Sequence, residues 1–227
     1  MKTMEAEIQH DLDAMPAKNV PNFRRLRRVW SRRLKDRPGP AVIALAKRLV
    51  RLGLWERGMA YEIILHHQKA LEALKPEDVR RLGQGISGWG EVDGFACHVA
   101  GVAWRLRRVP DSMVKGWARS HNRWWRRAAL VSTVPLNRPA LGGRGDAART
   151  LMICRMLAPD RDDMVVKALS WALRELCRWD RPAVEGFLEK HRLRLPARVK
   201  REVRNKLETG LKNPARFRMP GRRVRMA

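Results

Sequence analysis

Several residue types that build other classes of protein are scarce in this chain. Of its 227 residues, only three are cysteines and one is a tyrosine. Cys97, Cys154 and Cys177 are an odd number without CxxC spacing, so we interpret them as small buried hydrophobic residues of a reducing compartment. Clear runs of alternating apolar and polar residues are missing as well, which argues against β-strands.

Long apolar segments are also absent. No run of 18 apolar residues occurs, so the sequence predicts no membrane-spanning helix and no membrane partner. The first fourteen residues include Glu5, Glu7, Asp11 and Asp13, whereas a secretory signal needs a basic start and an apolar stretch. We therefore expect a cytoplasmic protein.

Metal-ligand patterns are equally hard to find. The chain has six histidines, and one of them, His66, stands at helical i,i+4 spacing from a possible second ligand, Glu62. No third ligand lies near them in the sequence, and a zinc site normally needs three or four protein ligands. The sequence predicts neither a metal nor a cofactor.

Acidic residues are outnumbered by basic ones. Asp and Glu total 23 against 49 Lys and Arg, which gives a formal net charge of +26. The many positive side chains repel one another, and binding to a polyanion would offset that repulsion. A generally basic composition from a high-GC genome is the alternative, but the arginines cluster in helix-like segments, which favours nucleic acid.

Helical periodicity is what the sequence has in abundance. Residues 41–52 keep an apolar stripe while Lys47, Arg48 and Arg51 face outward, and residues 61–65 give a second stripe. A third stripe predicts a helix over residues 163–177 and consists of Val165, Leu169, Ala172, Leu173 and Leu176. The sequence therefore predicts an all-α fold.

Prolines and glycines divide these helices into short units. The segments that begin at Pro76 and at Pro110–Asp111 have a proline followed by acidic residues, as in the first turn of a helix. Helices of about ten to seventeen residues that alternate with short turns are typical of stacked helix pairs. We expect one domain over residues 1–211, a longer loop over residues 137–149 and a flexible basic tail over residues 212–227.

Tryptophans close to charged residues mark the candidate site. Trp89 and Asp93 stand four residues apart and would share one face of a helix. Gly88 and Gly90 flank the tryptophan and suggest a bend or a helix start that lets another backbone come close. Trp171 falls at the edge of the third apolar stripe. By pattern alone, each tryptophan could also be a core residue, and Asp93 a surface or capping residue.

Arginine-rich stretches accompany these residues. Residues 122–129 read Asn-Arg-Trp-Trp-Arg-Arg-Ala-Ala, residues 167–175 read Lys-Ala-Leu-Ser-Trp-Ala-Leu-Arg-Glu, and residues 21–28 hold four arginines. Arginine suits phosphate because its planar fork donates two parallel hydrogen bonds. A solvated helix face is the alternative interpretation of an arginine pair.

Together, these stretches resemble the AlkD-type DNA alkylation-repair family, from about residue 20 to residue 211. The family's fold is a HEAT-like helical-repeat solenoid, which here would hold duplex DNA on a concave basic face. The resemblance implies a monofunctional DNA glycosylase that excises cationic N3- or N7-alkylated purines without flipping the base and leaves an abasic site. It further implies a monomer associated with the nucleoid.

The same resemblance assigns roles to individual residues. Asp93, Trp89 and Trp171 match the family's catalytic carboxylate and its two lesion-contacting tryptophans. The DNA-binding residues that it implies are Arg127, Arg126, Arg174, Lys167 and Arg24. Gly88 departs from relatives that carry a second aromatic residue there, and the segment around residues 142–145 is longer than usual. These departures leave the preferred adduct and the DNA footprint open.

A single carboxylate is sufficient for the implied chemistry. A purine alkylated at N3 or N7 is cationic and leaves as a neutral base, so it needs no general acid. The charge that develops on the sugar needs one ionised carboxylate, which can also orient water. We expect neighbouring arginines to favour the ionised form of Asp93.

Two alternatives belong to other classes. A noncatalytic helical-repeat protein would bind branched or damaged DNA, but should lack the set of Trp89, Asp93 and Trp171. A protein-interaction scaffold would have a concave surface of mixed charge, against which the net charge of +26 argues.

Overall fold

The structure is a computed structural model that describes residues 3–214, and every regular element in that range is a helix. The predicted all-α class is confirmed. The first half contains α1 (Met4–Asp13), α2 (Val20–Leu34), α3 (Gly39–Leu49), α4 (Leu54–Leu65), α5 (Gln68–Ala73), α6 (Pro76–Leu82), α7 (Trp89–Phe95), η1 (Ala96–Ala100) and α8 (Gly101–Arg105). The second half contains α9 (Asp111–Ala118), α10 (Arg123–Val131), α11 (Val134–Asn137), η2 (Pro139–Leu141), α12 (Ala147–Leu157), α13 (Asp163–Leu176), α14 (Arg181–Lys190) and α15 (Ala197–Thr209).

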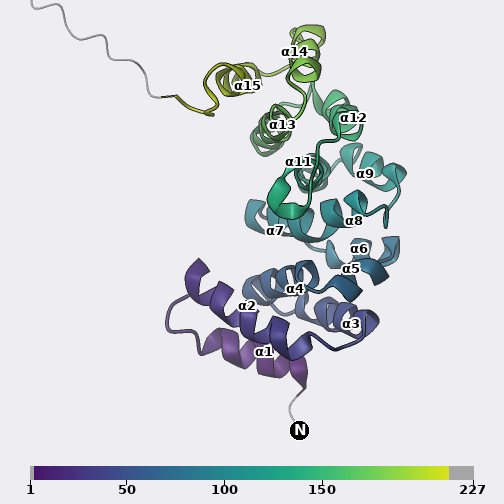
Figure 1. The fold of residues 1–227 in the computed structure, drawn as a ribbon, viewed down its shortest axis with the longest axis vertical. Coiled ribbons are helices and arrows are strands. Elements are labelled where there is room, and N and C mark those ends of the chain that lie inside the picture. Colours follow the sequence, from purple (N-terminus) through teal and green to yellow (C-terminus); the bar gives the residue numbers. More distant parts are fainter. Residues whose placement is uncertain (1–2, 215–227) are drawn as a thin grey trace, which may run out of the picture.

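The helices stack in sequence order along the long axis of the molecule (Figure 1). The chain runs from α1 and α2 at one end to α14 and α15 at the other. In this view α2, α7 and α13 lie on the left of the stack, and α3, α9 and α12 lie on the right. The arrangement is consistent with a helical-repeat fold. Most of the predicted tail, residues 215–227, lies outside the described residues.

Side-chain caps explain where many of these helices begin. Asn19, Asn122, Asp146, Asp162 and Asp180 each accept a hydrogen bond from a backbone N–H in the first turn of the next helix. Such caps satisfy N–H groups that have no partner within the helix. The helix starts predicted at residues 76 and 110–111 are confirmed by α6 and α9. The helix predicted over residues 163–177 is confirmed by α13.

The segment of residues 137–149 is more ordered than the predicted loop. It contains the one-turn helix η2 and the start of α12, so the irregular part is short. The side chain of Asn137 is buried, donates to Thr133 and Thr150 and accepts from the backbone N–H of Asp146 at 3.0 Å. This one amide therefore ties both ends of the segment together, which the loop-like composition did not reveal.

An aromatic cluster fixes α7 against its neighbours. The ring of Phe95 lies 5.9 Å, centroid to centroid, from each of Tyr61, Trp117 and Trp125. These residues come from α4, α9 and α10, so the end of α7 is held by three helices. Tilted and edge-on aromatic pairs of this kind are each worth about 0.5–1.5 kcal/mol beyond the area that they bury. The cluster therefore anchors the helix that carries Asp93.

None of the helices in residues 3–214 combines the length and the apolar character that a transmembrane segment requires.

Candidate active site

The start of α7 is held in place by Glu91. Its carboxylate accepts hydrogen bonds from the backbone N–H groups of Ser87 and Gly88, both at 3.0 Å, and lies 3.2 Å from the Nε of Arg57 on α4. The acceptor satisfies N–H groups at the helix start, and the arginine ties the turn to α4. The orientation of α7 is thus fixed at both ends.

Trp89 is the first residue of α7, and 65% of its surface is exposed. The core alternative for this tryptophan is therefore wrong. Of the bend and the helix start, the helix start is confirmed, since Gly88 is the N-cap of α7. Within residues 3–214, no other backbone approaches Gly88 or Gly90 closely. A Cβ added at Gly90 would meet no atom within 4 Å. The first turn of α7 is open to a partner.

Asp93 lies one turn further along α7 and is paired with Arg127 of α10. Arg127 donates from Nε to Oδ1 at 2.9 Å and from Nη2 to Oδ2 at 2.7 Å. Its third nitrogen, Nη1, donates to the carbonyl oxygen of Met164 at the start of α13 at 2.6 Å. Arg127 is only 6% exposed. This one side chain therefore joins α7, α10 and α13 and holds the carboxylate in a fixed plane.

Burial and Arg127 act on the Asp93 carboxyl in opposite directions. Burial raises the pKa of Asp93, while the hydrogen bonds and the positive charge of Arg127 lower it, and the pKa remains raised overall. We expected neighbouring arginines to favour the ionised form of Asp93, and Arg127 does lower the pKa of this carboxyl. Burial outweighs that contribution, so Asp93 gains protons at a higher pH than an exposed aspartate.

Asp93 opens into a cleft of about 460 Å³. Trp171 on α13 and Arg24 on α2, which are far apart in the sequence, line the same cleft. The full lining consists of Arg24, Gly90, Asp93, Gly94, Cys97, His98, Arg138, Ala140, Leu141 and Trp171. The structure thus brings together three of the predicted site residues, and Trp89 lies one helical turn from Asp93 at the exposed start of α7.

Arg138 and His98 were missed by the sequence analysis. Arg138 is exposed on the turn before η2, inside the segment that was interpreted as a loop. His98 reaches the cleft because residues Ala96–Ala100 form a π-helix directly after α7. A π-helical turn is wider than an α-helical turn, so it changes which later residues share a face with Asp93. Nothing in the local sequence signals such a turn.

His98 belongs to a small polar group with Glu62. The Glu62 carboxylate lies 3.7 Å from Nδ1 of His98, 3.4 Å from Nε2 of His66 and 3.5 Å from Nε of Arg27. Burial lowers the pKa of His98, which keeps the imidazole neutral near pH 7. Within residues 3–214, no group of three or more His, Cys, Asp or Glu side chains is arranged to hold a metal ion.

Trp171 is partly buried at the edge of the apolar face of α13, as the stripe predicted. Its indole Nε1 donates to Oε1 of Glu175, four residues later, at 2.9 Å. Arg174 donates from Nε to Oγ of Ser170, which in turn donates to the buried Glu202. These contacts orient the tryptophan, while Arg174 is braced by a hydroxyl on its own helix.

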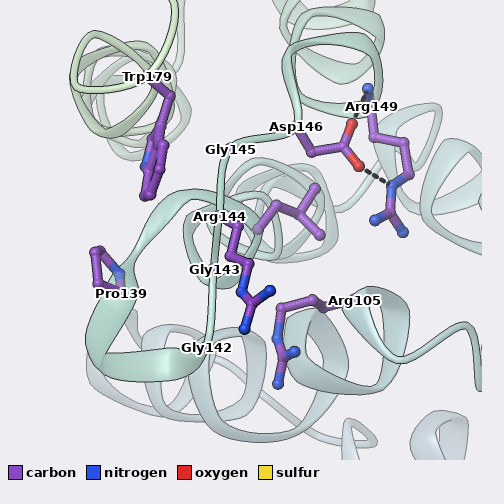
Figure 2. A pocket seen from close by; sticks show the side chains of 10 residues that line it. Arg105, Pro139, Gly142, Gly143, Arg144, Gly145, Asp146, Arg149 and Trp179 are labelled. Atoms are coloured by element: carbon purple, nitrogen blue, oxygen red, sulfur yellow. Dashed lines mark hydrogen bonds and ion pairs between the residues drawn. The ribbon is translucent and has the colours of Figure 1, made fainter.

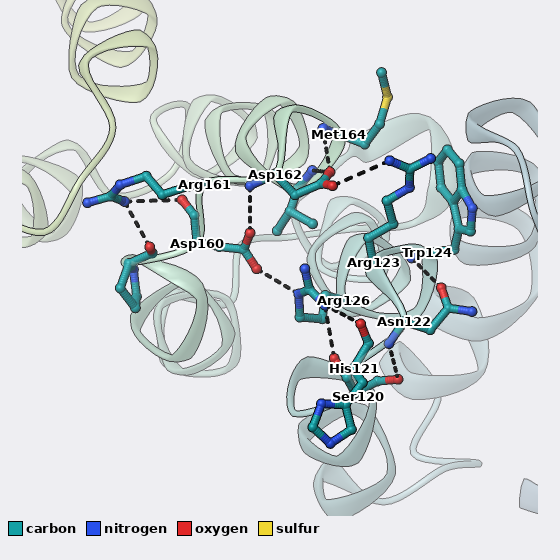
Figure 3. Close-up of polar contacts among 12 residues, drawn as sticks. Ser120, His121, Asn122, Arg123, Trp124, Arg126, Asp160, Arg161, Asp162 and Met164 are labelled. Atoms are coloured by element: carbon teal, nitrogen blue, oxygen red, sulfur yellow. Dashed lines mark hydrogen bonds and ion pairs between the residues drawn. The ribbon is translucent and has the colours of Figure 1, made fainter.

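Arg126 and Lys167 do not line the cleft. The Nε of Arg126 donates to Asp160 at 2.7 Å, and its Nη1 donates to the carbonyl oxygens of Ser120 and His121 (Figure 3). Lys167 is exposed and pairs with Asp163 at 2.7 Å. Arg126 thus links α10 to the turns before α10 and α13. DNA contacts by Arg126, Arg127, Lys167 and Arg174 stay predictions.

Comparison with known proteins identifies the family. The family described as DNA alkylation repair enzyme matches residues 3–207. The chain belongs to this family. No match was found among curated proteins. The match covers nearly all of the described helices and so includes the residues that line the cleft. Membership of the family implies a role in the repair of alkylated DNA.

Proposed function

We propose that this member of the DNA alkylation repair family is a DNA glycosylase. It removes cationic N3- or N7-alkylated purines from duplex DNA, without flipping the base, and leaves an abasic site. The observation that carries the proposal is a single oriented carboxylate, Asp93, at a cleft that also holds Trp171 and the arginines Arg24 and Arg138.

Asp93 supplies the electrostatic part of the reaction. As the glycosidic bond of a cationic purine breaks, the base leaves neutral and positive charge develops on the sugar. A carboxylate fixed near the anomeric carbon stabilises that charge and directs water toward it. Arg127 occupies one side of both carboxylate oxygens and leaves their remaining lone pairs for the substrate. We therefore propose that Arg127 positions the Asp93 carboxylate.

The two tryptophans act on the same developing charge. The negative face of an indole ring attracts a cation within about 6 Å, and this attraction strengthens when water is excluded. Trp171 lines the cleft and is held by Glu175, and Trp89 is exposed at the start of α7, one helical turn from Asp93. We propose that both rings contact the lesion-bearing sugar, as the resemblance to the family implies.

Recognition of the DNA would act on its backbone. Arg24 and Arg138 line the cleft and have no carboxylate partner within ion-pair distance in residues 3–214. Free guanidinium groups at a cleft suit phosphate and read shape and charge rather than sequence. We place the duplex along the side of the stack formed by α2, α7 and α13, as the concave basic face of a HEAT-like solenoid.

The test is the formation of abasic sites at a defined lesion. A duplex with one 7-methylguanine is incubated with the protein and then treated with alkali, which cuts the strand at abasic sites. We expect cleavage at the lesion above that of a protein-free sample, because alkali also attacks 7-methylguanine itself, and none in an unmodified duplex. Tight, salt-dependent binding without cleavage would instead favour the noncatalytic DNA-binding alternative.

Substitution of Gly90 tests how closely the DNA approaches α7. Because a Cβ at this position meets nothing within 4 Å, Gly90→Ala should stabilise the free protein by about 0.5–1 kcal/mol. We expect excision to fall at least about tenfold, a loss of about 1.4 kcal/mol, because the methyl group occupies space that the DNA backbone fills. Melting temperatures and single-turnover rates measure the two effects.

The matched control is Gly116→Ala on α9, where an added Cβ also meets nothing within 4 Å. It should give the same gain in stability and no change in excision. Equal excision by both variants would exclude a close approach of DNA at Gly90.

The raised pKa of Asp93 predicts a loss of activity in mild acid. The ionised carboxylate is the active form, so excision declines as the pH falls through the pKa of the folded protein. That decline should begin at a higher pH than for an exposed aspartate. Single-turnover rates across pH, corrected for acid-catalysed base loss without protein, measure it. A flat profile down to the range of an ordinary aspartate would contradict the assignment.

A further inference from the structure

A second cavity lies on the other side of η2 from the catalytic cleft and has a volume of about 670 Å³. Its walls come from the end of α8, the loop of residues 142–146, the start of α12 and Trp179 (Figure 2). Arg138, Ala140 and Leu141 line the cleft, whereas Pro139 and Gly142 line this cavity. One helical turn therefore separates the two spaces.

Two arginines extend into this cavity side by side. Figure 2 shows the side chains of Arg105 and Arg144 pointing in the same direction. The Nε of Arg105 is buried and has no hydrogen-bond partner. Burial and the nearby charge of Arg144 both lower the pKa of Arg105. Two like charges near each other cost free energy, and a bound anion offsets that repulsion.

The carboxylate in the wall is already engaged. Oδ2 of Asp146 accepts from Nε of Arg149 at 2.7 Å, and its Oδ1 caps α12 through the backbone N–H of that same residue. Arg149 also donates from Nη1 to the carbonyl oxygen of Trp104 at 2.7 Å. In the described part of the chain, Arg105 and Arg144 lack an ion-pair partner. The positive charge of the cavity is not balanced from within.

The loop backbone presents Arg144 in this position. Gly142 and Gly145 flank the segment and have φ values of +77° and +88°, a region that other residues rarely adopt. A Cβ added at Gly142 would lie 2.9 Å from the Arg105 guanidinium, so the loop also packs directly on Arg105. The two arginines are thus brought together by a specific turn rather than by chance exposure.

We propose that this cavity is a phosphate-binding site in which Arg105 and Arg144 are the ligands. Its occupant is a backbone phosphate of the DNA strand that leaves the cleft at Asp93. Two guanidinium groups bind the oxygens of one phosphate through their terminal N–H groups. Only the choice of DNA as the source of the phosphate rests on the proposed function. A free phosphate compound is the other source of the same chemistry.

The test compares wild type with the double variant Arg105→Gln/Arg144→Gln. The control is Arg80→Gln/Arg119→Gln, which removes two exposed arginine charges from α6 and the end of α9, away from both cavities. Binding to a short unmodified duplex is measured at several salt concentrations. We expect the log–log salt slope to fall by about one to two for the double variant and to stay unchanged for the control.

A second measurement separates the sources and guards against misfolding. Inorganic phosphate should raise the melting temperature of wild type and of the control, but not of the double variant. Without phosphate, the double variant should melt no lower than wild type, because it loses a repulsive pair.

Each outcome decides one part of the proposal. Loss of both the salt-slope contribution and the phosphate effect supports a DNA phosphate in the site. Loss of the phosphate effect alone supports the site but overturns DNA as its source. Unchanged behaviour in both measurements overturns the site. If the double variant shows the slope change but the wild-type protein excises no base, the glycosylase is refuted and the phosphate site stands.

Discussion

Replacement of Asp93 by asparagine is expected to reduce the single-turnover rate of base release by at least about 100-fold while DNA binding is retained. Asparagine has nearly the same shape but no negative charge, so it cannot stabilise a positively charged sugar. Loss of a single preorganised electrostatic group typically costs a factor of about 10²–10³ in rate. Rates are measured with protein in excess over a duplex that carries 7-methylguanine.

The contact with Arg127 shapes the controls for this variant. Arg127 donates to both oxygens of Asp93, and an asparagine offers it only one acceptor. The variant's melting temperature is therefore checked and the assay run well below it. Asp93→Glu, which keeps the charge but moves it, should recover part of the lost rate if charge is decisive. Full activity of Asp93→Asn would remove the carboxylate from the mechanism.

Removal of Arg127 is expected to damage both stability and activity. In Arg127→Ala, Asp93 and the carbonyl oxygen of Met164 lose their donors in a largely buried site. Breaking a buried ion pair on one side costs about 3 kcal/mol or more, although protonation of Asp93 limits the loss. Without Arg127 the pKa of Asp93 rises further, so the acid decline in excision should move to higher pH.

Two further variants separate positioning from simple destabilisation. Arg127→Lys keeps the charge but not the paired hydrogen bonds, so it should retain more stability than activity. Lys47→Ala breaks the contact of Lys47 with Asp78, far from the cleft, and should lower stability without moving the pH profile. If Arg127→Ala leaves the excision rate and its pH dependence unchanged, Arg127 does not position the carboxylate.

Most of the helices, and the helix face that carries Trp89 and Asp93, could be predicted because their causes are local. Asn and Asp caps, prolines at first turns and apolar spacing set most helix starts and buried faces within a few residues. The i,i+4 relation of Trp89 and Asp93 follows from helix geometry alone. That of Trp171 and Glu175 does too, and the hydrogen bond between them could have been predicted from the same spacing.

The remaining features of the site depend on residues that are distant in the sequence. Arg127 lies 34 residues from Asp93, and only the packing of α7 against α10 shows that its guanidinium points inward to the carboxylate. The π-helix that brings His98 to the cleft has no local signature. The ordered turn at residues 137–149, which supplies Arg138, was hidden by a loop-like composition.

The glycosylase is tested most sharply by identifying what the protein releases from alkylated DNA. Methylated duplex DNA is incubated with wild-type protein, and the small molecules set free are identified by mass spectrometry. We expect intact 7-methylguanine and 3-methyladenine, in amounts equal to the abasic sites formed. Loss of the methyl groups with the bases still in the strand, or no release despite tight binding, would contradict the glycosylase.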